Sequence, residues 1–259
     1  MSRKLWGIVG SVCALAMVAI CATPARAQGE AKEKPPMYSY VGQWNIPRAQ
    51  WAEMAKLTAA DQKTLDKALA DGTIAGYGDD TNLVHQVDGS THDQWWSAMS
   101  LAGLLTVLDQ FYKNGSATSP VLVSATKHWD IIFVSRYYNW RPGSYKGAYT
   151  RVGYYKLKPD APDDAIETLS KNLIVPLLEK LLADGTILEY EIDTEAIHTE
   201  APGAFWVVFL APNAAALDKF NASFRDYQKA NPLGGPAFDS VVDFTAHRDY
   251  LDRTNATYK

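Results

Sequence analysis

Residues 65–77 read LDKALADGTIAGY, and residues 178–190 read LEKLLADGTILEY. The similarity continues to His85 and His198, which are separated by the same 113 residues. Chance similarity at average composition gives about one or two identities in a window of this size. A spacing far above about 50 residues is too long for a solenoid repeat. The sequence therefore predicts two copies of a whole small domain in one chain.

Both copies show the same order of expected elements. An alternating strand opens each copy, and a helix follows that ends at Gly72 or Gly185, where a left-handed helix stop is typical. Pro176 predicts a kink in this helix of copy two, and Thr58 with Asp61 indicates a restart in copy one. A second amphipathic helix lies between the third and last strands of each copy. The expected strands cover residues 38–46, 74–84, 94–100 and 132–138, then 149–157, 187–197, 204–210 and 244–250.

The order βαββαβ, found twice, is that of the ferredoxin-like unit, an antiparallel sheet with both helices on one face. Residues 205–210 read FWVVFL and are apolar on both faces of their strand. The sheet face without helices must therefore also be covered. We expect an α+β fold in which two tandem ferredoxin-like repeats pack sheet to sheet as a pseudo-dimeric α+β barrel, related by a pseudo-two-fold axis.

The repeated turn Ala-Asp-Gly-Thr-Ile and the aromatic third strands, with Trp95 and Trp96 in one copy and Phe205 and Trp206 in the other, resemble the dimeric α+β barrel superfamily in its fused tandem form. The resemblance covers residues 38 to 250. It implies several candidate activities, because the superfamily includes cofactor-free monooxygenases of aromatic substrates and haem-binding or haem-degrading members. No motif of the superfamily transfers a catalytic residue to this sequence.

The first residues predict a secretory signal peptide over residues 1–27. Arg3 and Lys4 give the positive start, residues 5–21 are apolar, and Ala25-Arg26-Ala27 is a small-x-small cleavage site. A membrane anchor is the alternative, but an apolar run of 17 residues is the minimum for a span. Lipidation of Cys21 is disfavoured because bulky Ile20 precedes it. We expect cleavage after Ala27 and a periplasmic or secreted protein.

The remaining chain divides into four predicted parts. A flexible leader covers residues 28–36, repeat one 37–138, a Pro- and Gly-containing linker 139–148, and repeat two 149–259. Cleavage removes Cys13 and Cys21, which are the only cysteines, so disulfides and thiolate sites are excluded. The mature chain carries 22 basic and 29 acidic residues, which argues against nucleic acid or a membrane surface as a partner. No metal-binding, nucleotide-binding or serine-hydrolase motif occurs, so no metal and no cofactor are expected.

Two repeated polar features are candidate site residues. His85 and His198 are candidates for proton transfer or ligand binding; the alternative is a hairpin-end histidine that bonds a backbone carbonyl. Arg136-x-Tyr138 and Arg248-x-Tyr250 each place an arginine and a tyrosine on one strand face, where they could hold a carboxylate or phenolate. The alternative is a salt bridge with an aromatic rim. His247 points away from Arg248 and has no expected counterpart in copy one, where Ser135 stands.

Aromatic residues form the third candidate feature. Trp44, Tyr77, Trp95 and Tyr155, with Tyr190 as the counterpart of Tyr77, could line a pocket for a flat apolar ligand, although aromatic side chains more often fill cores. We therefore expect an exported protein that binds a small apolar or aromatic ligand in a cleft of each half. One alternative is a cofactor-free oxygenase or isomerase in which a histidine moves a proton and Arg136 or Arg248 steadies an enolate. The other is a non-enzymatic interaction module.

Overall fold

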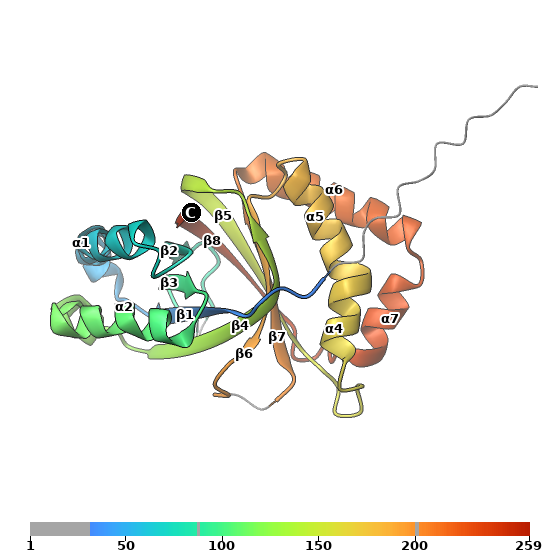
Figure 1. Ribbon diagram of the computed structural model, residues 1–259, viewed down its shortest axis with the longest axis horizontal. Helices are drawn as coiled ribbons and strands as arrows, with labels where there is room; N and C mark the ends of the chain where they lie inside the picture. The colour runs from blue at the N-terminus through green and yellow to red at the C-terminus, as the bar shows by residue number, and fades with distance from the viewer. Residues whose placement is uncertain (1–31, 87–88, 200–201) are drawn as a thin grey trace, which may run out of the picture.

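The computed structural model describes residues 32–86, 89–199 and 202–259, so the expected signal peptide lies outside the described residues. Eight antiparallel strands close into one barrel, and the helices cover its outside in two groups, α1 and α2 on one side and α4 to α7 on the other (Figure 1). Within the described residues, no helix combines the length and apolarity needed to cross a membrane.

The strands are β1 (Met37–Trp44), β2 (Gly76–Asn82), β3 (His92–Ala98), β4 (His128–Trp140), β5 (Gly143–Lys156), β6 (Glu189–Glu195), β7 (Ala204–Ala211) and β8 (Arg248–Tyr258). The helices are α1 (Trp51–Ala70), α2 (Leu101–Lys113), α3 (Pro120–Val123), α4 (Ala165–Leu169), α5 (Val175–Ala183), α6 (Ala214–Ala230) and α7 (Gly234–Val241). Two short 3₁₀ turns are η1 (Arg48–Gln50) and η2 (Ser116–Thr118), and η3 (Ser170–Ile174) is π-helical.

The strand order is β1-β3-β2-β8-β5-β7-β6-β4, and the ring is closed. Half one, β1 to β4, forms the sheet β4-β1-β3-β2, and half two, β5 to β8, forms β8-β5-β7-β6. The second strand of each half pairs with the fourth strand of the other, as β2 with β8 and β6 with β4. This confirms two tandem ferredoxin-like halves in a pseudo-dimeric barrel. The halves join edge to edge as well as facing each other, so every strand edge is paired.

The repeated turn that ends the first helix of each half has the predicted conformation. Gly72 and Gly185 have φ values of 80° and 77°, in the left-handed region that glycine adopts without strain. Asp71 accepts hydrogen bonds from the backbone N–H and the hydroxyl of Thr73, and Asp184 does the same for Thr186.

A second repeated contact joins each helix to the strand that follows it. The Tyr77 hydroxyl donates to Asp66 Oδ1 at 2.5 Å, and the Tyr190 hydroxyl donates to Glu179 Oε1 at 2.6 Å. The sequence similarity around residues 65–77 and 178–190 therefore encodes one helix–turn–strand unit, built twice.

Alternate residues of each strand divide between the helix layer and the barrel interior. Trp96 packs in the helix-side core of half one, whereas Trp95 lines the interior of the barrel, as their opposite faces predicted. In β7, Phe205 and Phe209 pack under the helices, and Trp206 faces the interior. This explains why residues 205–210 are apolar on both faces.

Several element boundaries differ from the predictions. Helix α1 is continuous, with no restart at Thr58. In half two, the π-helical segment η3 interrupts the first helix and ends two residues before Pro176, which has no N–H to donate. Strand β8 begins at Arg248, and residues 244–247 precede it. The predicted linker over 139–148 belongs mostly to β4 and β5, which leaves Arg141 and Pro142 between the strands.

The described end of the predicted leader lies along β4. The Lys34 N–H donates to the Arg136 carbonyl at 2.8 Å, and the Arg136 guanidinium donates to Glu33 Oε1 at 2.7 Å. The Tyr138 hydroxyl donates to the Pro35 carbonyl at 2.8 Å. Arg136 and Tyr138 thus hold this segment of the chain.

Candidate functional site

A histidine–aspartate pair lies where β8 of half two begins. His247 Nδ1 donates to the Tyr154 carbonyl at 2.8 Å, and its ring stacks on Tyr155 with 4.5 Å between ring centroids. Nε2 of His247 lies 3.5 Å from Asp249 Oδ2. The backbone carbonyl fixes the proton on Nδ1, which leaves Nε2 as the acceptor nitrogen of the ring, on the side of Asp249.

The same arrangement occurs at the start of β4 in half one. His128 Nδ1 donates to the Gln43 carbonyl at 3.0 Å, its ring stacks on Trp44 at 5.0 Å, and Nε2 lies 3.4 Å from Asp130 Oδ2. Trp44 and Tyr155 each lie over a glycine two residues earlier, Gly42 or Gly153, where a Cβ would meet the ring.

The strand registers show why the sequence alignment missed this pair. Gly42 of β1 is opposite Asp130, and Gly153 of β5 is opposite Asp249. The counterpart of His247 is therefore His128, not Ser135, and the expectation that His247 has no counterpart was wrong. The motif His-x-Asp, at 128–130 and 247–249, is a sequence signal that could have found both pairs.

The same registers correct the predicted Arg-x-Tyr repeat. Arg248 is the first residue of β8 and lies opposite Tyr154, whereas Arg136 lies well inside β4, beside a β-bulge between Ser135 and Tyr137. Arg136 is exposed and contacts the leader, while Arg248 and Tyr250 line the interior of the barrel. The two pairs are thus similar in sequence but not equivalent in the fold.

In half two, the histidine–aspartate pair borders a cleft between the sheet and the helices, which we call the half-two cleft. It encloses about 400 Å³. Arg151 NH2 lies 3.3 Å from Asp249 Oδ2, and Arg151 NH1 donates to Asn221 Oδ1 at 3.3 Å. Seven Phe and Tyr side chains line the cleft: Tyr155, Phe209, Phe220, Phe224, Tyr227, Phe238 and Phe244.

The cleft forms because the helices of half two pack less closely on their sheet. In half one, Trp96 of β3 donates to the Leu104 carbonyl of α2 and contacts Phe111, which fills this space. In half two, Phe209 takes the place of Trp96. The equivalence follows from the strand registers, because Tyr77 is opposite Trp96 and its counterpart Tyr190 is opposite Phe209. Of the residues in α6, only Ala216 is buried.

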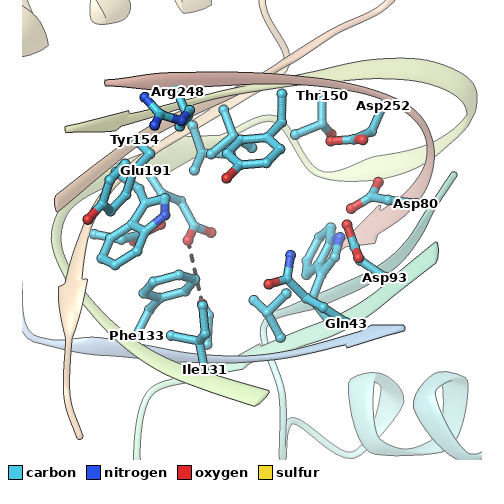
Figure 2. A pocket seen from close by; sticks show the side chains of 18 of the residues that line it. Gln43, Asp80, Asp93, Ile131, Phe133, Thr150, Tyr154, Glu191, Arg248 and Asp252 are labelled. Atoms are coloured by element: carbon cyan, nitrogen blue, oxygen red, sulfur yellow. Dashed lines mark hydrogen bonds between the residues drawn. The ribbon is translucent and has the colours of Figure 1, made fainter. Parts of the chain in front are cut away.

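A second cavity of about 530 Å³ lies inside the barrel, and we call it the barrel cavity. Figure 2 shows Asp80, Asp93 and Asp252 together on one wall, with Glu191 on another side. In all, six carboxyl groups line it: Asp80, Asp93, Glu189, Glu191, Asp193 and Asp252. Asp80 and Asp193 occupy the same place in the repeat, which is a signal that could have identified this cavity from the sequence.

Burial is the main reason why the pKa values of these carboxyl groups are raised. It raises the pKa of Asp93 to about 6, that of Asp193 to about 7 and, with the nearby charge of Asp93, that of Asp252 to about 8. Burial and neighbouring carboxylates also hold the pKa values of Glu189 and Glu191 well above their usual range. At neutral pH the cavity therefore holds a mixture of acids and carboxylates.

The structure does not bring the predicted site residues together. His85 and His198 lie in loops beyond β2 and β6 and are exposed, with His85 Nδ1 3.5 Å from Arg48 NH2. Trp44 packs in a core cluster of half one, and Tyr155 borders the cleft of half two, so they cannot share a pocket. Tyr77 and Tyr190 bind helix carboxylates, as described above. Trp95, Arg248 and Tyr250 line the barrel cavity.

A metal ion does not fit the side chains of these sites. Within residues 32–86, 89–199 and 202–259, no three His, Cys, Asp or Glu side chains approach closely enough to hold a metal ion.

Comparison with solved structures shows which known folds the chain is similar to. A proposed monooxygenase of Lactobacillus acidophilus superposes with a TM-score of 0.63 at 12% identity, covering 86% of this chain and 97% of that one. The chain has the dimeric α+β barrel fold. A proposed monooxygenase of Fusobacterium nucleatum gives a TM-score of 0.60 at 8% identity, covering 87% and 95% of the two chains. An anthrone oxidase-like protein gives 0.53 at 12% identity, covering 88% and 95%.

Comparison by sequence adds no relative to these similarities of the dimeric α+β barrel fold. No protein-family model matches the chain, and no curated protein matches it.

Proposed function

We propose that the protein binds a small, flat, apolar or aromatic molecule in the half-two cleft. The observation that carries this proposal is a space of about 400 Å³ with aromatic walls on one side and Arg151, His247 and Asp249 on the other. Ligand pockets are commonly about 300–1,000 Å³ and combine an apolar lining with a few polar groups.

Two further observations indicate that this cleft is a binding site and not a defect in packing. Phe224 and Phe244 border it and remain 43% and 49% exposed, which is costly for large apolar side chains unless a ligand covers them. The π-helical segment η3 also contributes Leu173 and Ile174 to the lining, and such segments occur often at functional sites. The similar folds include that of an anthrone oxidase-like protein, and anthrone is an aromatic compound.

The test is a calorimetric titration with 2-naphthol, a flat aromatic probe with one polar group. Wild-type protein should bind it, and Phe224→Ala should weaken binding about tenfold, because the loss of one stacking wall removes roughly 1–2 kcal/mol. The matched control is Tyr112→Ala, which removes another exposed aromatic ring from α2 in half one. Equal affinity in wild type and Phe224→Ala would contradict the assignment of the site.

A second candidate function follows from the polar side of the cleft. Nε2 of His247 can accept a proton from an acidic O–H or C–H of the bound molecule, and Arg151 can stabilise the resulting anion. An isomerase returns that proton to another carbon, so no co-reactant is needed, whereas an oxygenase consumes dioxygen. The geometry supports His247 and Arg151 in these roles rather than His85, His198, Arg136 or Arg248.

Proton transfer is tested by hydrogen–deuterium exchange at the carbon beside the carbonyl of 2-tetralone, followed by NMR in D₂O. Wild type should accelerate the exchange, and His247→Gln should slow the catalysed rate at least a hundredfold, the usual size of a general-base contribution. His198→Gln serves as the control, because that side chain is exposed and remote from the cleft lining. Exchange no faster than in buffer would leave ligand binding as the function.

We also propose that the chain is exported and cleaved after Ala27. The support is the positive start, the apolar run and the Ala25-Arg26-Ala27 site in the sequence. Amino-terminal sequencing of protein recovered from a secreting bacterial host should give Gln28 as the first residue. An intact Met1, or a start within the repeat, would contradict this proposal.

A further inference from the structure

Three aspartates on adjacent strands turn their carboxyl groups into the barrel cavity. Asp80 of β2 is directly opposite Asp93 of β3, and Asp252 lies on β8, the other neighbour of β2 (Figure 2). Like charges directly opposite each other destabilise a sheet. The arrangement works against folding, which indicates that it serves another purpose.

Each of these carboxyls has an oxygen without a protein partner. The Oδ1 atoms of Asp80, Asp93 and Asp252 make no hydrogen bond, although the three residues are only 7%, 7% and 3% exposed. The second oxygen of Asp93 is held, since Asn82 donates to Asp93 Oδ2 at 3.3 Å. Buried polar atoms are nearly always bonded in folded proteins, so three orphaned oxygens on one cavity wall point to a missing donor.

A primary ammonium group carries three N–H donors on one small positive charge. We propose that the barrel cavity binds a small primary amine, whose ammonium group donates to the Oδ1 atoms of Asp80, Asp93 and Asp252. A metal ion is the less suitable occupant, because carboxylate–metal bonds of about 2.0–2.6 Å require a tighter cluster than N–H···O contacts of about 2.8 Å. Among the described residues, no such tight cluster is present.

The rest of the cavity selects the body of the amine. Trp95, Trp129, Phe133 and Trp206 line it and offer aromatic faces to an apolar group or to the cation itself. Six carboxyl groups line the cavity, whereas two basic side chains, Lys156 and Arg248, do so. The interior therefore favours a bound cation. The ligand class is therefore an aryl- or alkyl-substituted primary amine.

Two of the other carboxyl groups of the cavity are hydrogen-bonded. Ser135 donates to Asp193, and Ser39 and Ser135 each lie 3.5 Å from Glu191 Oε2. Glu189 Oε1 also lacks a partner, but it is one oxygen, whereas the aspartate wall offers three on adjacent strands and is the main acceptor. This site is separate from the half-two cleft. Inward-facing side chains of the strands line the barrel cavity, whereas helix-facing side chains line the half-two cleft.

The test is calorimetric binding of 2-phenylethylamine, with 2-phenylethanol as the uncharged analogue of the same shape. At pH 7, the amine should bind at least tenfold more tightly than the alcohol. Asp80→Asn should weaken amine binding at least tenfold. Asp79→Asn is the matched control: Asp79 is the neighbouring residue of β2, faces the other side and binds Asn255, so this variant should keep wild-type affinity.

Proton release gives a second readout on the same wall. The pKa of Asp252 is about 8, so this group is mostly protonated at pH 7, and a bound ammonium should displace its proton. Titrations in buffers of different ionisation enthalpy should show release of up to one proton in wild type and less in Asp252→Asn. Circular dichroism confirms that each variant is folded. Equal affinity for amine and alcohol, or unchanged amine binding in Asp80→Asn and Asp252→Asn, would overturn the proposal.

Discussion

At the scale of single residues, the buried carboxyls of the barrel make the stability of the protein depend on pH in an unusual direction. The pKa values of Asp93, Asp193 and Asp252 are raised to about 6, 7 and 8 in the folded chain, whereas an unfolded aspartate titrates near 3.9. The folded state therefore binds more protons than the unfolded state between about pH 4 and 8. Stability is highest below this window and falls as the pH rises through it.

We expect the melting temperature to be at least about 5 °C lower at pH 8 than at pH 5, measured by calorimetry without ligand. The carboxyls with lowered pKa values, Asp71, Asp184 and Asp243, complete their titration below pH 5. His92, whose pKa burial lowers to about 4, acts in the opposite direction below about pH 6.5 but offsets only one of the three raised carboxyls. Asp252→Asn should reduce the difference, because the amide cannot ionise. A melting temperature that rises between pH 5 and 8 would contradict the burial of ionisable groups in the barrel.

Prediction from sequence was least successful at this scale. His85 and His198 are separated by the 113 residues of the sequence repeat, but both lie in exposed loops. The histidines that form the repeated pairs with aspartate are His128 and His247. Their spacing is 119 residues because the chain between the third and last strands is longer in half two, where both α6 and α7 are longer than α2 and α3 of half one. A comparison at one fixed offset cannot detect residues on the far side of such an insertion.

At the scale of elements, β2 approaches its neighbours so closely that one glycine is required. A Cβ on Gly78 would lie 2.5 Å from the Trp95 ring and 2.7 Å from the backbone carbonyl of Asn255 in β8. Gly78→Ala should therefore destabilise the fold by about 1–3 kcal/mol, measured by urea denaturation.

The control for this variant is Gly235→Ala in α7, where a Cβ has no neighbour within 4 Å. Alanine is the better helix former, so this change should leave stability unchanged or raise it by up to about 1 kcal/mol. If Gly78→Ala is as stable as wild type, β2 does not pass as close to β8 as described.

Element order and type were predictable because periodicity and turn residues are local signals. The paired strands β6 and β7 of half two lie within or at the predicted ranges, and the Gly72 and Gly185 stops are confirmed. The start of β5 was misplaced, since Pro142 and Gly143 suggested a long linker. Pairing with β8 extends β5 back to Gly143, which is a tertiary effect that composition does not record.

At the scale of the whole molecule, each half completes the sheet of the other. Residues 143–259 alone would expose the edges of β6 and β8 together with the carboxyl-lined face. We expect this isolated half to form a homodimer in which β6 pairs with β8 of the second copy, as detected by size-exclusion chromatography with light scattering. A stable monomer would show that barrel closure is not needed for folding.

The barrel was predictable at this scale because the repeat and the two-sided apolar strand each required a partner sheet. Its acidic interior was not predicted, since alternation with Tyr77 and Tyr190 made Asp80, Glu189 and Glu191 resemble solvent-facing positions. In the structure these positions face inward, toward a cavity that both halves enclose.

The central claim is that the half-two cleft is the site for a small aromatic ligand, and amide NMR shifts on titration with 2-naphthol test it most directly. We predict the largest shifts at Gly153, Val207 and Gly235, which line the cleft. The counterparts of the first two in half one, Gly42 and Gln94, should remain unchanged. Shifts concentrated in half one, or no saturable shifts, would contradict the account.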